Sequence, residues 1–311
     1  MYFSAYVQYA KQLLIQNRNS KYIDNSANIK RRFDSFLESY ISSTEKSYTQ
    51  TDLLESPPRA DAYICGSDQI WGGDEMYYLP FVPEGKKIIA YAPSFGGINK
   101  FPEKYKEHLK KYLARFDFLG IREQSGVDLC KKLGFPNAVK VVDPTLLLSS
   151  DDYDSIRIET KHSKPYIFLY LLGNPCACKV EDIYKFAKKH NLDIIYIASQ
   201  NQYDKYEKVC PQIGEWLDYL AKSEFVITNS FHCTVFSLIY KKKFMSIPLV
   251  GAFQRMNTRI EELLYNSALD HAIYKGNIES IYNSSFDFSS FYLYKDAEKE
   301  ISFSYFMSNL R

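Results

Sequence analysis

The chain has 311 residues, a formal net charge of +2 and 46% hydrophobic residues. Charged residues make up 24%, and there are only 13 Gly and 12 Pro, which excludes a disordered or collagen-like chain. The near-neutral charge argues against nucleic acid as a partner. No apolar run approaches the roughly 20 residues that span a bilayer, and the first residues lack a secretory signal. We therefore expect a cytoplasmic globular protein with one large domain or two ordinary ones.

The first two predicted elements are helices. Residues 2–16 place apolar side chains at helical spacing, and residues 27–43 repeat the pattern after a basic start at Lys30, Arg31 and Arg32. A solvated helix face explains this basic cluster better than a site for acidic lipid or phosphate. Helix 2–16 could make a peripheral membrane contact, but its few cations favour packing against the core.

From residue 61, short apolar runs alternate with helical patterns. Strands are expected at 62–65, 87–91, 118–121 and 139–142, with helices at about 102–115 and 124–133. Continuous apolar strands that alternate with helices predict a parallel sheet covered on both faces. The polar stretch 149–164 that follows is the best candidate for a linker.

The alternation starts again after this linker. Strands are expected at 166–172, 193–198, 225–228 and 244–247, helices at 178–190, 212–222 and 231–241, and a final helix within 286–310. We therefore predict an α/β fold of two facing, doubly wound, Rossmann-like domains, at residues 1–150 and 151–311. The final helix is expected to cross back onto the first domain. Ligands of such folds bind beyond the carboxyl ends of the strands, so the functional residues are expected in those loops.

Three strand-end loops of the first domain carry polar residues. Ser67 and Asp68 follow the first strand, with Trp71 as an aromatic stacking face, and Ser94 follows the second strand. Arg122 lies at a strand-to-helix junction, where a guanidinium can bind a carboxylate or phosphate. Each loop also has an explanation without a ligand. These are a helix cap followed by a core tryptophan for the first loop, a plain turn for the second and a surface ion pair of Arg122 for the third.

The loop after strand 225–228 is the most informative. Asn229 and Ser230 are N-cap residue types, and they place His232 in the first helical turn, near the positive end of the helix dipole. This end attracts anions, and a histidine there can act as a general acid or base. The alternative interpretation is a structural histidine.

A second loop of this domain carries Arg255, Asn257 and Arg259 at the start of an amphipathic helix. Together these residues can form an anion clamp, although a solvated helix start explains them equally well. The chain has no P-loop, no GxGxxG, GxSxG or HExxH motif and no DxD pair. Its six cysteines form no Cys-x-x-Cys pair, so we expect reduced thiols and no metal site. Metal-free chemistry on an anionic substrate is the remaining prediction.

Six segments in sequence order together resemble the polysaccharide pyruvyl transferase family. They are GSDQIW (66–71), YAPSFG (91–96), GIREQSG (120–126), VVDPTLLL (141–148), FVITNSFHCTVFSLIYKKKF (225–244) and NTRIEELL (257–264). Each segment alone is weak evidence for the family, but six segments in the same order make the resemblance specific. It implies a fold like that of GT-B glycosyltransferases. It also implies transfer of pyruvate from phosphoenolpyruvate onto two hydroxyls of a sugar, as a cyclic ketal.

On this resemblance, His232 is the predicted catalytic acid/base. The donor is expected to contact Arg122, Asn229, Ser230, Arg255, Asn257 and Arg259, and the acceptor to contact Ser67, Asp68, Trp71 and Ser94. Some members of the family carry Arg-Leu-His where this chain has Ser230-Phe231-His232. Arg122 or Arg259 would then have to supply more of the phosphate binding.

The resemblance also implies the partners and the setting. Phosphoenolpyruvate is the expected co-substrate, no other cofactor is expected, and the acceptor is a saccharide of a bacterial capsule or exopolysaccharide, free or lipid-linked. The expected location is the cytoplasm, at the inner face of the membrane if the acceptor is lipid-linked. Family members usually begin with a strand and loop that this chain lacks, so its first domain is expected to be short of that strand. The alternatives are a GT-B-type glycosyltransferase that uses a nucleotide sugar, and a non-catalytic glycan-binding relative.

Overall fold

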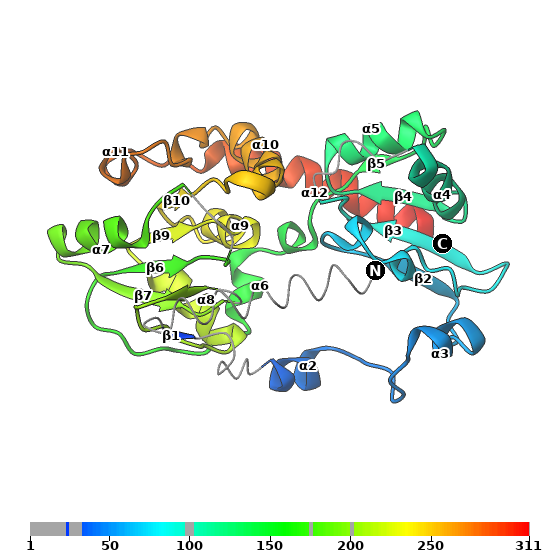
Figure 1. Ribbon diagram of the computed structural model, residues 1–311, viewed down its shortest axis with the longest axis horizontal. Helices are drawn as coiled ribbons and strands as arrows, with labels where there is room; N and C mark the ends of the chain where they lie inside the picture. The colour runs from blue at the N-terminus through cyan, green and yellow to red at the C-terminus, as the bar shows by residue number, and fades with distance from the viewer. Residues whose placement is uncertain (1–22, 25–32, 97–102, 174–176, 200–201, 311) are drawn as a thin grey trace.

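The computed structural model describes residues 23–24, 33–96, 103–173, 177–199 and 202–310. The predicted helix 2–16 and the start of the predicted helix 27–43 lie outside these residues. The protein is an α/β fold with two parallel, four-stranded sheets, each flanked by helices, as predicted (Figure 1). Within the described residues, none of the helices combines the length and the apolar character that a membrane span requires.

The first sheet has the strand order β2-β3-β4-β5, and all of its pairs are parallel. Its elements are β2 (Ala62–Cys65), β3 (Lys87–Tyr91), α4 (Glu103–Leu113), β4 (Phe118–Ile121), α5 (Gln124–Lys132) and β5 (Val139–Lys140). The prediction extended β5 to residue 142. The strand ends at Lys140, although the Val141 N–H still donates to the Ile121 carbonyl of β4 at 2.9 Å, and the Val142 N–H donates to the Ser302 hydroxyl at 2.9 Å.

The second sheet has the order β10-β9-β6-β7, again all parallel. Its elements are β6 (Tyr166–Tyr170), α7 (Val180–Lys189), β7 (Asp193–Ile197), α8 (Ile213–Lys222), β9 (Phe225–Thr228), α9 (Phe231–Ile239) and β10 (Phe244–Ser246). The four strands are apolar and largely buried because helices cover both faces of the sheet. The predicted elements are confirmed here, with ends that differ by a few residues.

The remaining elements lie around the two sheets. They are β1 (Ile23–Asp24), α2 (Asp34–Tyr40), α3 (Gln50–Glu55), α6 (Ser150–Asp154), β8 (Tyr203–Asp204), α10 (Thr258–Asn266), α11 (Ile278–Tyr282) and α12 (Ser289–Leu310). The long helix α12 contacts α10 near the second sheet and β4 in the first sheet (Figure 1). At the first sheet, Tyr305 packs so closely on Gly120 that a Cβ there would lie 2.7 Å from its ring. This contact explains why β4 carries a glycine.

The polar stretch between the sheets is held in place by Asp218 of α8. The buried Asp218 carboxylate accepts hydrogen bonds from the Arg157 guanidinium and from the backbone N–H and hydroxyl of Thr160, at 2.7 Å each. Lys222 lies 2.9 Å away on the same helix. Burial opposes ionisation, but these donors outweigh it and lower the pKa of Asp218 to about 2.

We predict that Asp218→Ala lowers the free energy of unfolding by about 3 kcal/mol, because it leaves Arg157 and the Thr160 N–H without their acceptor. Urea denaturation at pH 7 measures this loss. The pKa of Asp218 is lower in the folded state, so its contribution is complete above about pH 4 and is lost as the pH falls toward 2. Asp182→Ala, which breaks an exposed pair with Lys185, should cost less than about 1 kcal/mol. Equal effects of the two variants would contradict this account.

Candidate active site

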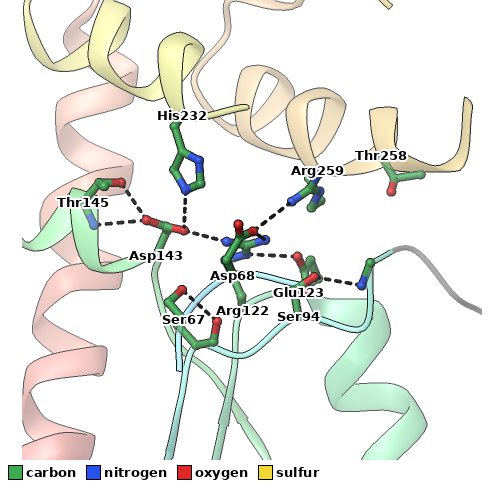
Figure 2. A network of polar contacts seen from close by, with 12 residues as sticks. Ser67, Asp68, Ser94, Arg122, Glu123, Asp143, Thr145, His232, Thr258 and Arg259 are labelled. Carbon is green, nitrogen blue, oxygen red and sulfur yellow. Dashed lines mark hydrogen bonds and ion pairs between the residues drawn. The ribbon is translucent and has the colours of Figure 1, made fainter. Parts of the chain in front are cut away.

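The candidate active site lies where the carboxyl ends of strands from both sheets meet. Asp68 follows β2, Arg122 follows β4, and His232 lies in the first turn of α9, directly after β9. Arg259 comes from the start of α10, after β10. Figure 2 shows these four side chains converging from the two halves of the protein. This is the location at which doubly wound folds bind ligands.

Arg122 lies at the centre of this cluster and is almost completely buried. Its guanidinium donates to three carboxylates: Nε to Glu123 at 3.1 Å, Nη1 to Asp143 at 2.7 Å and Nη2 to Asp68 at 3.2 Å. Burial disfavours its charge, but the three carboxylates outweigh this and raise the pKa of Arg122. The charge of Arg122 is therefore already compensated inside the protein. These contacts give Arg122 a positioning role, and its predicted contact with the donor stays a prediction.

Asp143 is a site residue to which sequence reasoning gave no role. It follows β5 and caps the short 3₁₀ helix Pro144–Leu147, accepting from the backbone N–H and hydroxyl of Thr145. Its side chain is only 3% exposed. Burial raises its pKa, but the hydrogen bond and charge of His232 and the charge of Arg122 outweigh burial and hold the pKa of Asp143 well below its usual value. The available signal was an Asp-Pro pair directly after an apolar strand, which is also a common helix cap.

His232 stands over Asp143, with its Nε2 3.5 Å from Asp143 Oδ2 (Figure 2). The first turn of α9 fixes the backbone of His232, because the Ser230 hydroxyl accepts from the Cys233 N–H at 3.4 Å. The His232 side chain is 41% exposed. It can therefore reach a bound molecule on one side while Asp143 orients it on the other.

Arg259 is the second buried guanidinium of the site. Its Nη1 lies 4.0 Å from Asp68, the Gln69 amide can accept from its Nη2 at 2.8 Å, and its Nε has no partner among the described residues. Burial and repulsion from Arg122 lower the pKa of Arg259. The guanidiniums of Arg122 and Arg259 lie 5.3 and 5.4 Å from the centroid of the Phe231 ring, which attracts both cations. Phe231 is a second site residue that the sequence analysis did not assign.

Arg122, Asp143, Phe231 and Arg259 line an open cleft of about 40 Å³, whereas Asp68 and His232 are not among its lining residues. Lys140 lies on the same wall, but Glu262 at 2.9 Å and the Tyr294 hydroxyl at 3.1 Å engage its ammonium. In the described part of the site, Arg259 is therefore the least compensated cation.

Several predicted contact residues serve the fold instead. Asn229 bonds to both backbone groups of Leu172, and Asn257 does the same with Leu249, so neither side chain is available to a donor. Ser230 is buried as the cap of α9. Each of these three side chains positions a strand-end loop, which corrects the prediction that they bind the donor.

Two acceptor predictions are also corrected, whereas the donor contact of Arg255 stays a prediction. Trp71 is fully buried, stacks on Tyr78 at 5.1 Å and presents no face to a sugar. Ser94 is fully buried, and its hydroxyl accepts from the Gly96 N–H. Arg255 is exposed on the short 3₁₀ helix Gly251–Asn257 and has no ion pair among the described residues. Ser67 stays half-buried beside Asp68 and donates to the Ala92 carbonyl at 3.0 Å.

The comparison with family models identifies the class of this protein. A model described as polysaccharide pyruvyl transferase matches residues 6–249, which is most of the chain. The protein therefore belongs to the polysaccharide pyruvyl transferase family, and the resemblance seen in the sequence is confirmed. The family indicates a transferase of polysaccharide synthesis. The comparisons with curated proteins and with solved structures gave no match.

We predict strong coupling between Arg122 and Asp143 in a double-mutant cycle. Arg122→Gln and Asp143→Asn should each lower the free energy of unfolding by about 3 kcal/mol, because each removes the nearest partner of a buried charge. The double variant should lose at least about 1 kcal/mol less than the sum of the two. Chemical denaturation measures all four corners of the cycle. The exposed pair Lys185 and Asp182 is the control, with an expected coupling below about 0.5 kcal/mol. Additive losses for Arg122 and Asp143 would show that the buried pair is not a unit.

Proposed function

We propose that the protein transfers pyruvate from phosphoenolpyruvate to two hydroxyls of a saccharide of a cell-surface glycan or its precursor, forming a cyclic ketal. The observation that carries this proposal is that a buried cation with an unpartnered donor, Arg259, and an exposed histidine, His232, converge on Arg122 in a family member (Figure 2). The donor is a small anion, and the reaction needs both a cation and a proton source.

Arg259 and the start of α9 supply the positive charge for the donor. Nε of Arg259 is buried without a partner, which is costly unless a ligand accepts its hydrogen bond. The N–H groups of Phe231 and His232 lie in the first turn of α9, where no carbonyl of the helix can accept from them. A carboxylate or phosphate between Arg259 and this turn would satisfy both sets of donors. These donors would supply the phosphate binding that the arginine at the position of Ser230 is expected to provide in other family members.

His232 is proposed to deliver the proton that the donor carbon needs. Phosphoenolpyruvate becomes electrophilic at C2 when its methylene carbon C3 gains a proton, and a sugar hydroxyl can then form a bond to C2. An imidazolium at His232 is a suitable acid, and Asp143 keeps its ring in a fixed orientation. Loss of phosphate and attack by the second hydroxyl then close the ketal. The proposed mechanism assigns no step to a metal or a cofactor.

We expect His232→Asn to lower the rate of phosphate release from phosphoenolpyruvate by about 10²–10⁴-fold, because the amide cannot donate the required proton. A coupled phosphate assay with a panel of glycosides measures this rate. His108→Asn, a substitution on α4, outside the site, is the matched control and should keep the wild-type rate. Full activity of the His232 variant would disprove its role. No phosphate release by the wild type with any acceptor would disprove the proposed donor.

A further inference from the structure

Each half of ketal formation pairs one proton that is given with one that is taken. In the first half of the reaction, C3 gains a proton while the attacking hydroxyl loses one. In the second half, the departing phosphate gains a proton while the second hydroxyl loses one. One imidazole cannot give and take a proton at the same moment, so a concerted addition or elimination uses a second acid/base group beside His232. This argument rests on the proposed function.

Three carboxylates surround Arg122, and Asp68 is the one with the most exposed side chain. The side chain of Asp143 is 3% exposed and that of Glu123 is 12% exposed, whereas that of Asp68 is 58% exposed. Both contacts of Asp68, with Arg122 and Arg259, involve Oδ1. Within the part of the chain that the structure describes, Oδ2 of Asp68 accepts no hydrogen bond. This oxygen is therefore available to a substrate hydroxyl.

The backbone conformation of Asp68 is fixed by contacts with a neighbouring loop. Asp68 has a φ of +65°, in the left-handed region that residues other than glycine rarely adopt. The Ser94 N–H donates to the Asp68 carbonyl at 2.8 Å, and Asp68 and Pro93 form an isolated parallel bridge. These contacts with the loop after β3 fix the conformation. In Figure 2, the Asp68 side chain rises from its loop to the side of Arg122 on which His232 lies. Such strained residues are concentrated at functional sites.

We infer that Asp68 is the second acid/base group of the reaction. In the first half, Asp68 takes the proton of the attacking hydroxyl, His232 gives its proton to C3, and the O–C2 bond forms. In the second half, Asp68 gives its proton to the departing phosphate oxygen as the C2–O bond breaks. His232 takes the proton of the second hydroxyl as it attacks C2. Both residues return to their starting states, and the products are the ketal and hydrogen phosphate.

Asp68 could serve only to pair with the two arginines, or it could also act as a base. The experiment separates these two roles. Asp68→Asn keeps an oxygen that can accept from Arg122 and removes the base. We expect kcat to fall by about 10²–10⁴-fold, with the phosphoenolpyruvate-induced rise in melting temperature retained. Added formate should restore phosphate release by Asp68→Ala at least tenfold, because formate can occupy the vacated space as a base.

Asp154→Asn is the matched control, because Asp154 is similarly exposed and pairs with Arg157 at 2.8 Å outside the cleft. It should keep the wild-type rate, and formate should not change that rate. An Asp68→Asn variant within about threefold of the wild-type rate, or an Asp68→Ala variant that formate does not restore, would overturn the role of Asp68. A wild-type protein that releases no phosphate from phosphoenolpyruvate would instead overturn the proposed function.

Discussion

The site depends on a single guanidinium shared among three carboxylates. Arg122 joins Asp68 after β2, its neighbour Glu123 after β4, and Asp143 after β5, so it fixes the carboxyl ends of three strands of the first sheet. A lysine could not replace it, because one ammonium cannot donate in three fixed directions from a planar fork. The same guanidinium lies over the ring of Phe231, at the start of α9 beside the second sheet. The geometry of the cleft therefore follows from where Arg122 is held.

The two buried arginines therefore differ in how far their charges are compensated. Arg122 is paired on all sides, whereas Arg259 keeps an unpartnered Nε and is repelled by Arg122. A bound anion would relieve that repulsion and satisfy the free donor, which gives the site a physical reason to bind a small, strongly charged molecule. His232 is oriented by Asp143 and stays partly exposed. The same arrangement leaves Asp68 as the accessible carboxylate.

The sequence was sufficient to predict the two-sheet fold and part of the candidate site. Periodic apolar runs predicted both parallel sheets, because buried strands and amphipathic helices have distinct patterns, and strand-end positions pointed to Asp68, Arg122, His232 and Arg259. The sequence could not show which of these side chains stay available. Asn229 and Asn257 have the chemistry of ligands, but only the folded chain brings them against the backbone of Leu172 and Leu249. Asp143 and Phe231 were missed because a capping aspartate and a core phenylalanine have the same local patterns.

The central claim is that the cleft binds phosphoenolpyruvate through Arg259, and a thermal-shift titration tests it most directly. A ligand that binds only the folded protein stabilises it by about 2.7 kcal/mol at a hundredfold excess over its dissociation constant. We expect phosphoenolpyruvate to raise the melting temperature of the wild type by several degrees, Arg259→Gln to abolish that rise, and UDP- and GDP-sugars to give none. Stabilisation by a nucleotide sugar but not by phosphoenolpyruvate, or an unchanged response of Arg259→Gln, would contradict the account.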